Sequence, residues 1–194
     1  MEAFLTSAAV VALAEIGDKT QLLAILLATR FNRPWPIVAG IFGATIANHF
    51  LAALVGSEVA GLLDGAWFRY LIAASFIAMA AWTLIPDKLD DVAARPARFG
   101  AFLTTLIAFF LVEMGDKTQV ATIALGARFH AVVPVTMGTT LGMMIANVPA
   151  VFLGSALIRR VPLGAVRAIA ALLFLAIGLW LLAQTAGWIQ SIAR

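Results

Sequence analysis

The chain has 194 residues, of which 63% are hydrophobic and only 12% are charged. A soluble domain usually carries about 25% charged residues, so this composition excludes an ordinary soluble protein and predicts an integral membrane protein. The net charge of +3 comes from scattered arginines rather than a clustered basic face, which argues against a nucleic-acid partner. The chain has no cysteine, which excludes disulfides, thiolate metal sites and cysteine nucleophiles.

The N-terminal segment is expected to stay in the mature protein as a membrane helix. Met1 runs almost directly into apolar sequence, without the basic region that opens a signal peptide. The same segment carries Glu15, Asp18 and Lys19, which the hydrophobic region of a signal peptide does not tolerate.

Six apolar segments are long enough to cross a bilayer, which takes roughly 20 residues. The predicted fold is therefore all-α, with six transmembrane helices at about 4–29, 35–57, 66–86, 100–126, 131–157 and 164–187. A charged connection divides the chain nearly in half. We expect a first three-helix repeat at 1–86, a cytoplasmic linker at 87–99 and a second three-helix repeat at 100–194.

The two halves resemble each other in sequence. The heptapeptide Glu15–Gln21 recurs 98 residues later as Glu113–Gln119, and we call these the first and second motifs. Further matches at or near this offset join Arg30 with Arg128, Pro36 with Pro134, Gly40 with Gly138 and Asn48 with Asn147. Because three is an odd number of segments, the second half must enter the membrane from the opposite side. The halves are thus predicted to be inverted repeats.

The distribution of basic residues predicts the orientation. Counted outside the motifs, eight basic residues fall on one side: Arg30, Arg33, Lys88, Arg95, Arg98, Arg159, Arg160 and Arg167. Three fall on the other: Arg69, Arg128 and Arg194. The positive-inside rule places the first group in the cytoplasm and both termini outside it.

The motifs place ionisable side chains inside membrane segments. Each Asp, Lys or Arg at the centre of a spanning helix costs about 2.5–3.5 kcal/mol, so such a cluster is a functional hypothesis by default. The alternative is a buried salt-bridge network that fixes helix packing, although packing alone would not need two carboxylates in each copy.

The spacing within a motif predicts how its side chains lie. Glu15 and Asp18 are three residues apart and would share a helix face, and Lys19 would pair with Glu15 one turn away. Gly17 would permit close helix contact or a local break in the helix. The second motif repeats the pattern, and inverted symmetry would bring both acidic faces together near the bilayer midplane.

The residue types in the motifs indicate a site for a hard cation. The predicted metal ligands are Glu15, Asp18, Glu113, Asp116, Gln21, Gln119, Asn48 and Asn147, with Lys19 and Lys117 balancing charge. Carboxylate and amide oxygens suit Ca²⁺, Mn²⁺ or Mg²⁺. Four carboxylates and two ammonium groups sum to −2, which one divalent cation or two protons would neutralise. The motifs therefore predict exchange of metal for protons.

The supporting groups have alternative readings. Asn48 and Asn147 could instead make interhelical hydrogen bonds. Thr20 and Thr118 could be ligands or could bond to their own helix backbone. His49 aligns with Val148 of the second repeat, and it could relay protons or be a buried packing residue.

Two copies of Glu-x-Gly-Asp-Lys-Thr in a six-segment chain of this length resemble the GDT-type cation transporter family. The family includes bacterial manganese exporters and organellar Ca²⁺/Mn²⁺ transporters, and it is regarded as a relative of the cation/Ca²⁺ exchangers. The resemblance implies that Glu15, Asp18, Glu113 and Asp116 form the cation site and that transport is coupled to protons. It also implies a bacterial inner-membrane protein, because the organellar members carry an N-terminal extension.

The sequence thus predicts a secondary transporter that exports Mn²⁺, or Ca²⁺, with no resident cofactor and no enzymatic activity. Its expected partners are the cation, protons and membrane lipid, and nothing in the sequence indicates an oligomer. The rival functions are a divalent-cation channel and a structural membrane protein with a buried salt-bridge network.

Overall fold

The fold is that of a computed structural model, which describes residues 1–63, 65–85, 99–154 and 162–189. Every regular element in these ranges is an α-helix. Almost all of the predicted linker at 87–99 lies outside the described residues, as do the predicted ends of the third and fifth segments.

Eight helices follow one another in the described parts of the chain. They are α1 (Glu2–Glu15), α2 (Lys19–Phe31), α3 (Pro34–Leu62), α4 (Ala66–Thr83), α5 (Ala101–Glu113), α6 (Lys117–Phe129), α7 (Val132–Leu153) and α9 (Leu163–Thr185). The predicted segments 4–29 and 100–126 are thus each two helices, so of the two roles that Gly17 could play the structure has the local break.

Both breaks arise from the motif itself. Gly17 and Gly115 have φ values of 82° and 81°, a left-handed conformation that glycine adopts without the steric penalty other residues pay. Asp18 and Asp116 follow with extended backbones and begin α2 and α6. The two breaks therefore share one backbone conformation, which the repeated Gly-Asp pair dictates.

Four of the helices are long and apolar enough to cross a membrane, namely α3, α4, α7 and α9. This confirms the prediction of an apolar helical protein with several spanning helices. The four helices beside the breaks have 13 or 14 residues each. At 1.5 Å per residue each is about 20 Å long, less than the roughly 30 Å of a hydrocarbon core.

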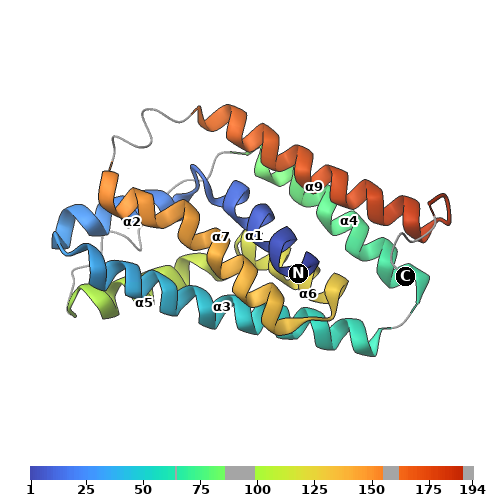
Figure 1. Ribbon diagram of the computed structural model, residues 1–194, viewed down its shortest axis with the longest axis horizontal. Helices are drawn as coiled ribbons and strands as arrows, with labels where there is room; N and C mark the ends of the chain where they lie inside the picture. Colours follow the sequence, from blue (N-terminus) through green and yellow to red (C-terminus); the bar gives the residue numbers. More distant parts are fainter. Residues whose placement is uncertain (64, 86–98, 155–161, 190–194) are drawn as a thin grey trace.

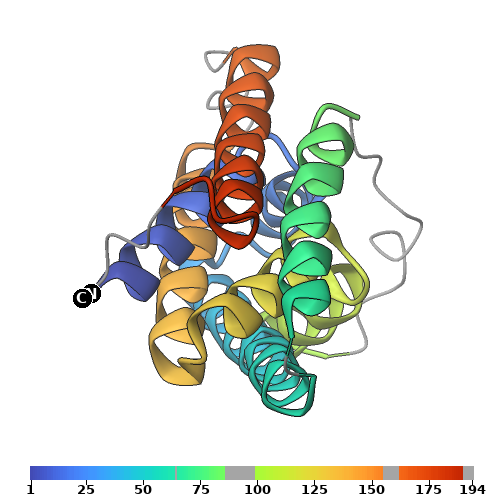
Figure 2. The same ribbon diagram turned by 90° about the vertical axis from the view of Figure 1, so that its right-hand side faces the viewer.

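The helices lie along the long axis of the molecule, and their direction alternates along the chain when α1 with α2 and α5 with α6 are each taken as one broken segment (Figure 1). α1, α2, α4 and α7 run one way, whereas α3, α5, α6 and α9 run the other (Figure 1). Seen end-on, α4 and α9 lie together on one side of the remaining helices (Figure 2).

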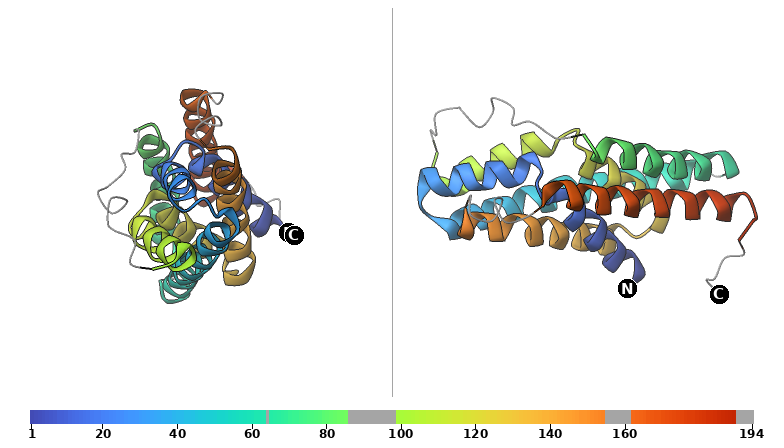
Figure 3. Two further views of the ribbon diagram at one scale, coloured as in Figure 1. Left: turned by 90° about the vertical axis from the view of Figure 1, so that its left-hand side faces the viewer. Right: turned by 90° about the horizontal axis from the view of Figure 1, so that it is seen from above.

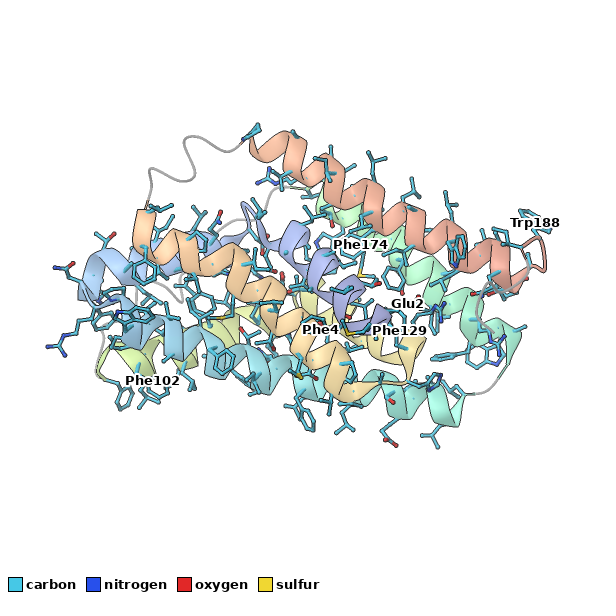
Figure 4. The ribbon with its side chains drawn as sticks, in the orientation of Figure 1. Glu2, Phe4, Phe102, Phe129, Phe174 and Trp188 are labelled. Carbon is cyan, nitrogen blue, oxygen red and sulfur yellow. The ribbon has the colours of Figure 1, made fainter. Side chains whose placement is uncertain are left out.

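The two halves exchange matched contacts. α3 packs on α5 and the corresponding α7 packs on α1. At Gly40 an added β-carbon would meet the Phe102 carbonyl, and at Gly138 it would meet the carbonyl of Phe4, the residue 98 positions before Phe102. Phe4 and Phe102 are well separated along the long axis (Figure 4). Glycine thus allows close helix contact at equivalent places in both halves.

Candidate metal centre

The four motif carboxylates lie at the two breaks, one between α1 and α2 and the other between α5 and α6. Glu15 and Glu113 are the last residues of α1 and α5, while Asp18 and Asp116 directly precede α2 and α6. All four are buried. The expectation that Glu15 and Asp18 share a face of one helix is wrong, because the left-handed glycine separates them.

Three of these carboxylates converge across the two motifs. Glu15, Glu113 and Asp116 each offer an oxygen, and the three oxygens lie within 4.8 Å of one another. We call this group the carboxylate cluster. Oxygen ligands of Ca²⁺ lie about 2.3–2.6 Å from the ion, so three oxygens at this spacing can contact one cation.

Each lysine pairs with an aspartate of the other motif. Lys19 Nζ lies 2.9 Å from Asp116 Oδ1, and Lys117 Nζ lies 2.6 Å from Asp18 Oδ1. The predicted pair of Lys19 with Glu15 is therefore wrong, because the break redirects α2 away from the end of α1. The two crossed ion pairs connect the halves at the site.

The motif threonines donate to the glutamates of their own motifs rather than to the helix backbone. Thr20 donates to Glu15 Oε2 at 2.5 Å, and Thr118 donates to Glu113 Oε2 at 2.9 Å. The other oxygen of each glutamate, Oε1, is buried without a hydrogen bond in the described part of the chain. The hydrogen bond from each threonine fixes the orientation of its glutamate carboxylate. The Oε1 atoms of the two glutamates are therefore available to a cation.

The motif glutamines stabilise the backbone at the two breaks by hydrogen bonds. Gln21 Oε1 accepts from the Gly17 amide at 3.0 Å, and Gln119 Oε1 accepts from the Gly115 amide at 2.7 Å. Gln21 also donates to the Ala146 carbonyl of α7 at 2.9 Å. The oxygens predicted as ligands therefore already bond to the motif backbone.

The remaining predicted residues lie on α3 and α7. Asn48 donates to the Phe110 carbonyl of α5 at 2.9 Å, which is the interhelical bond foreseen as the alternative. Asn147 donates to Met143 of its own helix, and its Oδ1 is buried without a hydrogen bond among the described residues. His49 is fully buried and lies outside the carboxylate cluster.

One contact to the first motif was missed by the sequence analysis. Arg167, in the second turn of α9, donates to the Gly17 carbonyl at 3.3 Å. Sequence reasoning counted Arg167 only as a basic residue outside the motifs. Its distance of 98 residues from Arg69, the repeat offset, is the signal that could have singled it out.

The profile described as "Divalent cation/proton antiporter GDT1" matches residues 3–91 and 101–188, nearly the whole chain. The chain belongs to this family. It is thus a multi-pass membrane protein of a cation-transporting family, as the resemblance implied.

Individual relatives of this GDT1 family member span almost its full length. A Vibrio cholerae protein named "Putative manganese exporter" is 50% identical over 180 residues, covering 92% of this chain and 90% of the relative. A GDT1-like protein of Synechocystis is 29% identical and covers 90% of this chain and 93% of its own. "GDT1-like protein 4" of Oryza sativa is also 29% identical, over 92% of this chain and 72% of its own. No solved structure matches the chain.

Proposed function

We propose that this protein is a secondary transporter that exports Mn²⁺, with Ca²⁺ as the second candidate substrate, in exchange for protons. The observation that carries the proposal is the carboxylate cluster, in which buried oxygens from both motifs converge within the reach of one cation. The bacterial inner membrane, with both termini outside the cytoplasm, is the location that suits this role.

The proposed architecture is six spans in two inverted repeats. α1 with α2 and α5 with α6 would each form one broken span. The alternating helix directions and the matched glycine contacts of the two halves support this arrangement. In such folds, discontinuous helices place their ends at the midplane, and the C-terminal end of a half-helix favours a cation. Glu15 and Glu113 lie at such ends.

The crossed lysines suggest how metal and protons compete. Lys19 and Lys117 serve as tethered cations for the two aspartates. The four carboxylates and two lysines sum to −2, so either one divalent ion or two protons makes the site neutral. A neutral site can reorient in a low-dielectric membrane far more easily than a charged one. This requirement links the movement of metal to the opposite movement of protons.

The ligand types favour Mn²⁺ or Ca²⁺. The carboxylate cluster is all-oxygen and contains no imidazole or thiolate, which suits hard divalent ions rather than Cu²⁺ or Zn²⁺. The name of the Vibrio cholerae relative, which describes a manganese exporter, supports Mn²⁺ over Ca²⁺.

Metal-dependent stability of the purified protein tests the site. A cation that binds only the folded state adds about 2.7 kcal/mol at 100 times its Kd, so Mn²⁺ should raise the melting temperature. Glu15→Gln and Glu113→Gln should each remove that increase. Glu58→Gln, at an exposed position of α3, is the matched control and should keep it. A folded Glu15→Gln protein that still responds to Mn²⁺ like the wild type would exclude the proposed site.

The two rival functions predict different results. A channel would pass metal without coupled protons. A purely structural cluster would show no response of stability to metal. Asp18→Asn and Asp116→Asn should each lower transport about 100-fold, the upper end of the loss caused by removing a partner of a metal ligand. Wild-type flux in both would argue against the transporter.

A further inference from the structure

The helices α4 and α9 lie outside the motifs, yet they carry an arginine and a phenylalanine at matching positions of the repeat. Neither the motifs nor the carboxylate cluster explains these residues. Arg69 of α4 and Arg167 of α9 are 98 residues apart, and so are Phe76 and Phe174 of the same helices. The two phenylalanine rings pack with their centroids 6.2 Å apart, in the interface between α4 and α9. α4 and α9 are therefore equivalent helices of the two repeats. They form one antiparallel pair, in which Phe174 packs on the matching Phe76 (Figure 4).

The two arginines nevertheless have different surroundings. Arg167 is half-buried and donates to the Gly17 carbonyl in the first break. Arg69 is exposed and lines a cavity of about 670 Å³ near the ends of α3, α4, α6 and α9. Among the described residues, no side chain donates to the carbonyl of Gly115, the counterpart of Gly17.

The two breaks also differ in how exposed their residues are, and the first break is again the more covered one. Ile16 and Gly17 are half-buried, whereas Gly115 is exposed and Met114 has 56% of its surface exposed. Viewed from above, α4 and α9 lie toward one end of the molecule and α2 and α5 toward the other (Figure 3). α9 packs on α1, and α4 packs on α6. The paired helices therefore cover the two breaks unequally.

We propose that Arg167 and Arg69 are alternate positioning residues for the two motifs. In this state Arg167 anchors α9 on the first break. When the protein faces the other side of the membrane, α4 covers the second break, Arg69 donates to the Gly115 carbonyl and Arg167 is released. The physical basis is that inverted repeats generate the second access state by exchanging their conformations. The inference rests on the proposed transport function, because it assigns these arginines to its two access states.

Cysteine labelling tests this proposal cleanly, since the natural chain has no cysteine. Ile16→Cys and Met114→Cys mark equivalent positions of the two breaks, and a charged thiol reagent reports how accessible each is. Met114→Cys should react several-fold faster than Ile16→Cys. Adding Arg167→Gln should speed labelling at Ile16→Cys and slow it at Met114→Cys. Adding Arg69→Gln should slow it at Ile16→Cys and speed it at Met114→Cys.

The opposite shifts separate this role from a general loss of structure. A merely structural arginine would change both rates in the same direction or neither, and either result would overturn the proposal. Arg167→Lys, which keeps a charged donor, should restore most of the wild-type pattern, and its failure to do so would also count against it. Labelling does not depend on metal flux, so reciprocal shifts in a protein that carries no metal would reject the transport function and leave the two states standing.

Discussion

The motif side chains form a connected set across the two halves. Lys19 and Lys117 each reach an aspartate of the opposite motif, while Thr20 and Thr118 hold one oxygen of their own glutamates. A buried charge whose partner is removed costs about 3–5 kcal/mol, so these crossed pairs fix how the motifs face each other. Under the proposed function, the lysines compete with an incoming cation for these aspartates.

Lys117→Gln should separate metal affinity from turnover. The variant loses the ion pair between Lys117 and Asp18, and the six-group sum changes from −2 to −3. Mn²⁺ should then bind more tightly, yet one divalent ion no longer neutralises the site, so both KM and the maximal rate should fall. Initial rates of Mn²⁺ uptake into proteoliposomes measure both. Arg33→Gln, which removes an exposed charge, should change neither. A raised KM in Lys117→Gln would contradict the competition between lysine and metal.

At the scale of elements, glycine decides both where the helices break and where they touch. Gly56 of α3 lies so close to α6 that an added β-carbon would overlap the Ile123 carbonyl, and at Gly126 it would lie 2.5 Å from the Ala53 carbonyl. Backbone cannot move aside as a flexible side chain can. α3 and α6 are therefore held together by an approach that only glycine permits.

Gly56→Ala should destabilise the protein, because the overlap forces the two helices apart. Overpacking of this kind costs about 1–3 kcal/mol. Gly61→Ala is the matched control in the same helix, since nothing lies within 4 Å of its added β-carbon. It should be neutral or stabilising, as alanine is favoured over glycine in helices by roughly 0.5–1 kcal/mol. Unfolding in detergent measures the difference, and equal stability of the two variants would refute the close contact.

The sequence could predict what depends on local chemistry. Long apolar runs predicted α3, α4, α7 and α9, and the repeated motif predicted the family. Which of its two allowed roles Gly17 plays depends on a left-handed φ that composition cannot reveal. Once the helix breaks there, Lys19 faces Asp116 instead of Glu15, so the ion pairs could not be read from helical spacing. The contact of Arg167 with the first motif depends on tertiary packing in the same way.

At the scale of the whole molecule, two related halves meet at one site. Helix directions, matched glycine contacts and crossed ion pairs all relate one half to the other, whereas α4 and α9 depart from that relation (Figure 1). Two crossed ion pairs beneath an unequal cover fit the proposed alternating access, in which one bundle of helices rocks against the other around a fixed site. Under the proposed function, the net charge of −2 on the four carboxylates and two lysines is what one divalent ion or two protons would balance.

The most direct test is metal flux into proteoliposomes with an internal metal-sensitive dye and a parallel pH probe, with Mn²⁺ and Ca²⁺ measured separately. The account predicts that metal movement is matched by proton movement in the opposite direction, and that both disappear in Asp18→Asn. Metal movement without protons would contradict the exchange and favour a channel. The absence of any metal movement in a folded wild-type protein would contradict transport itself.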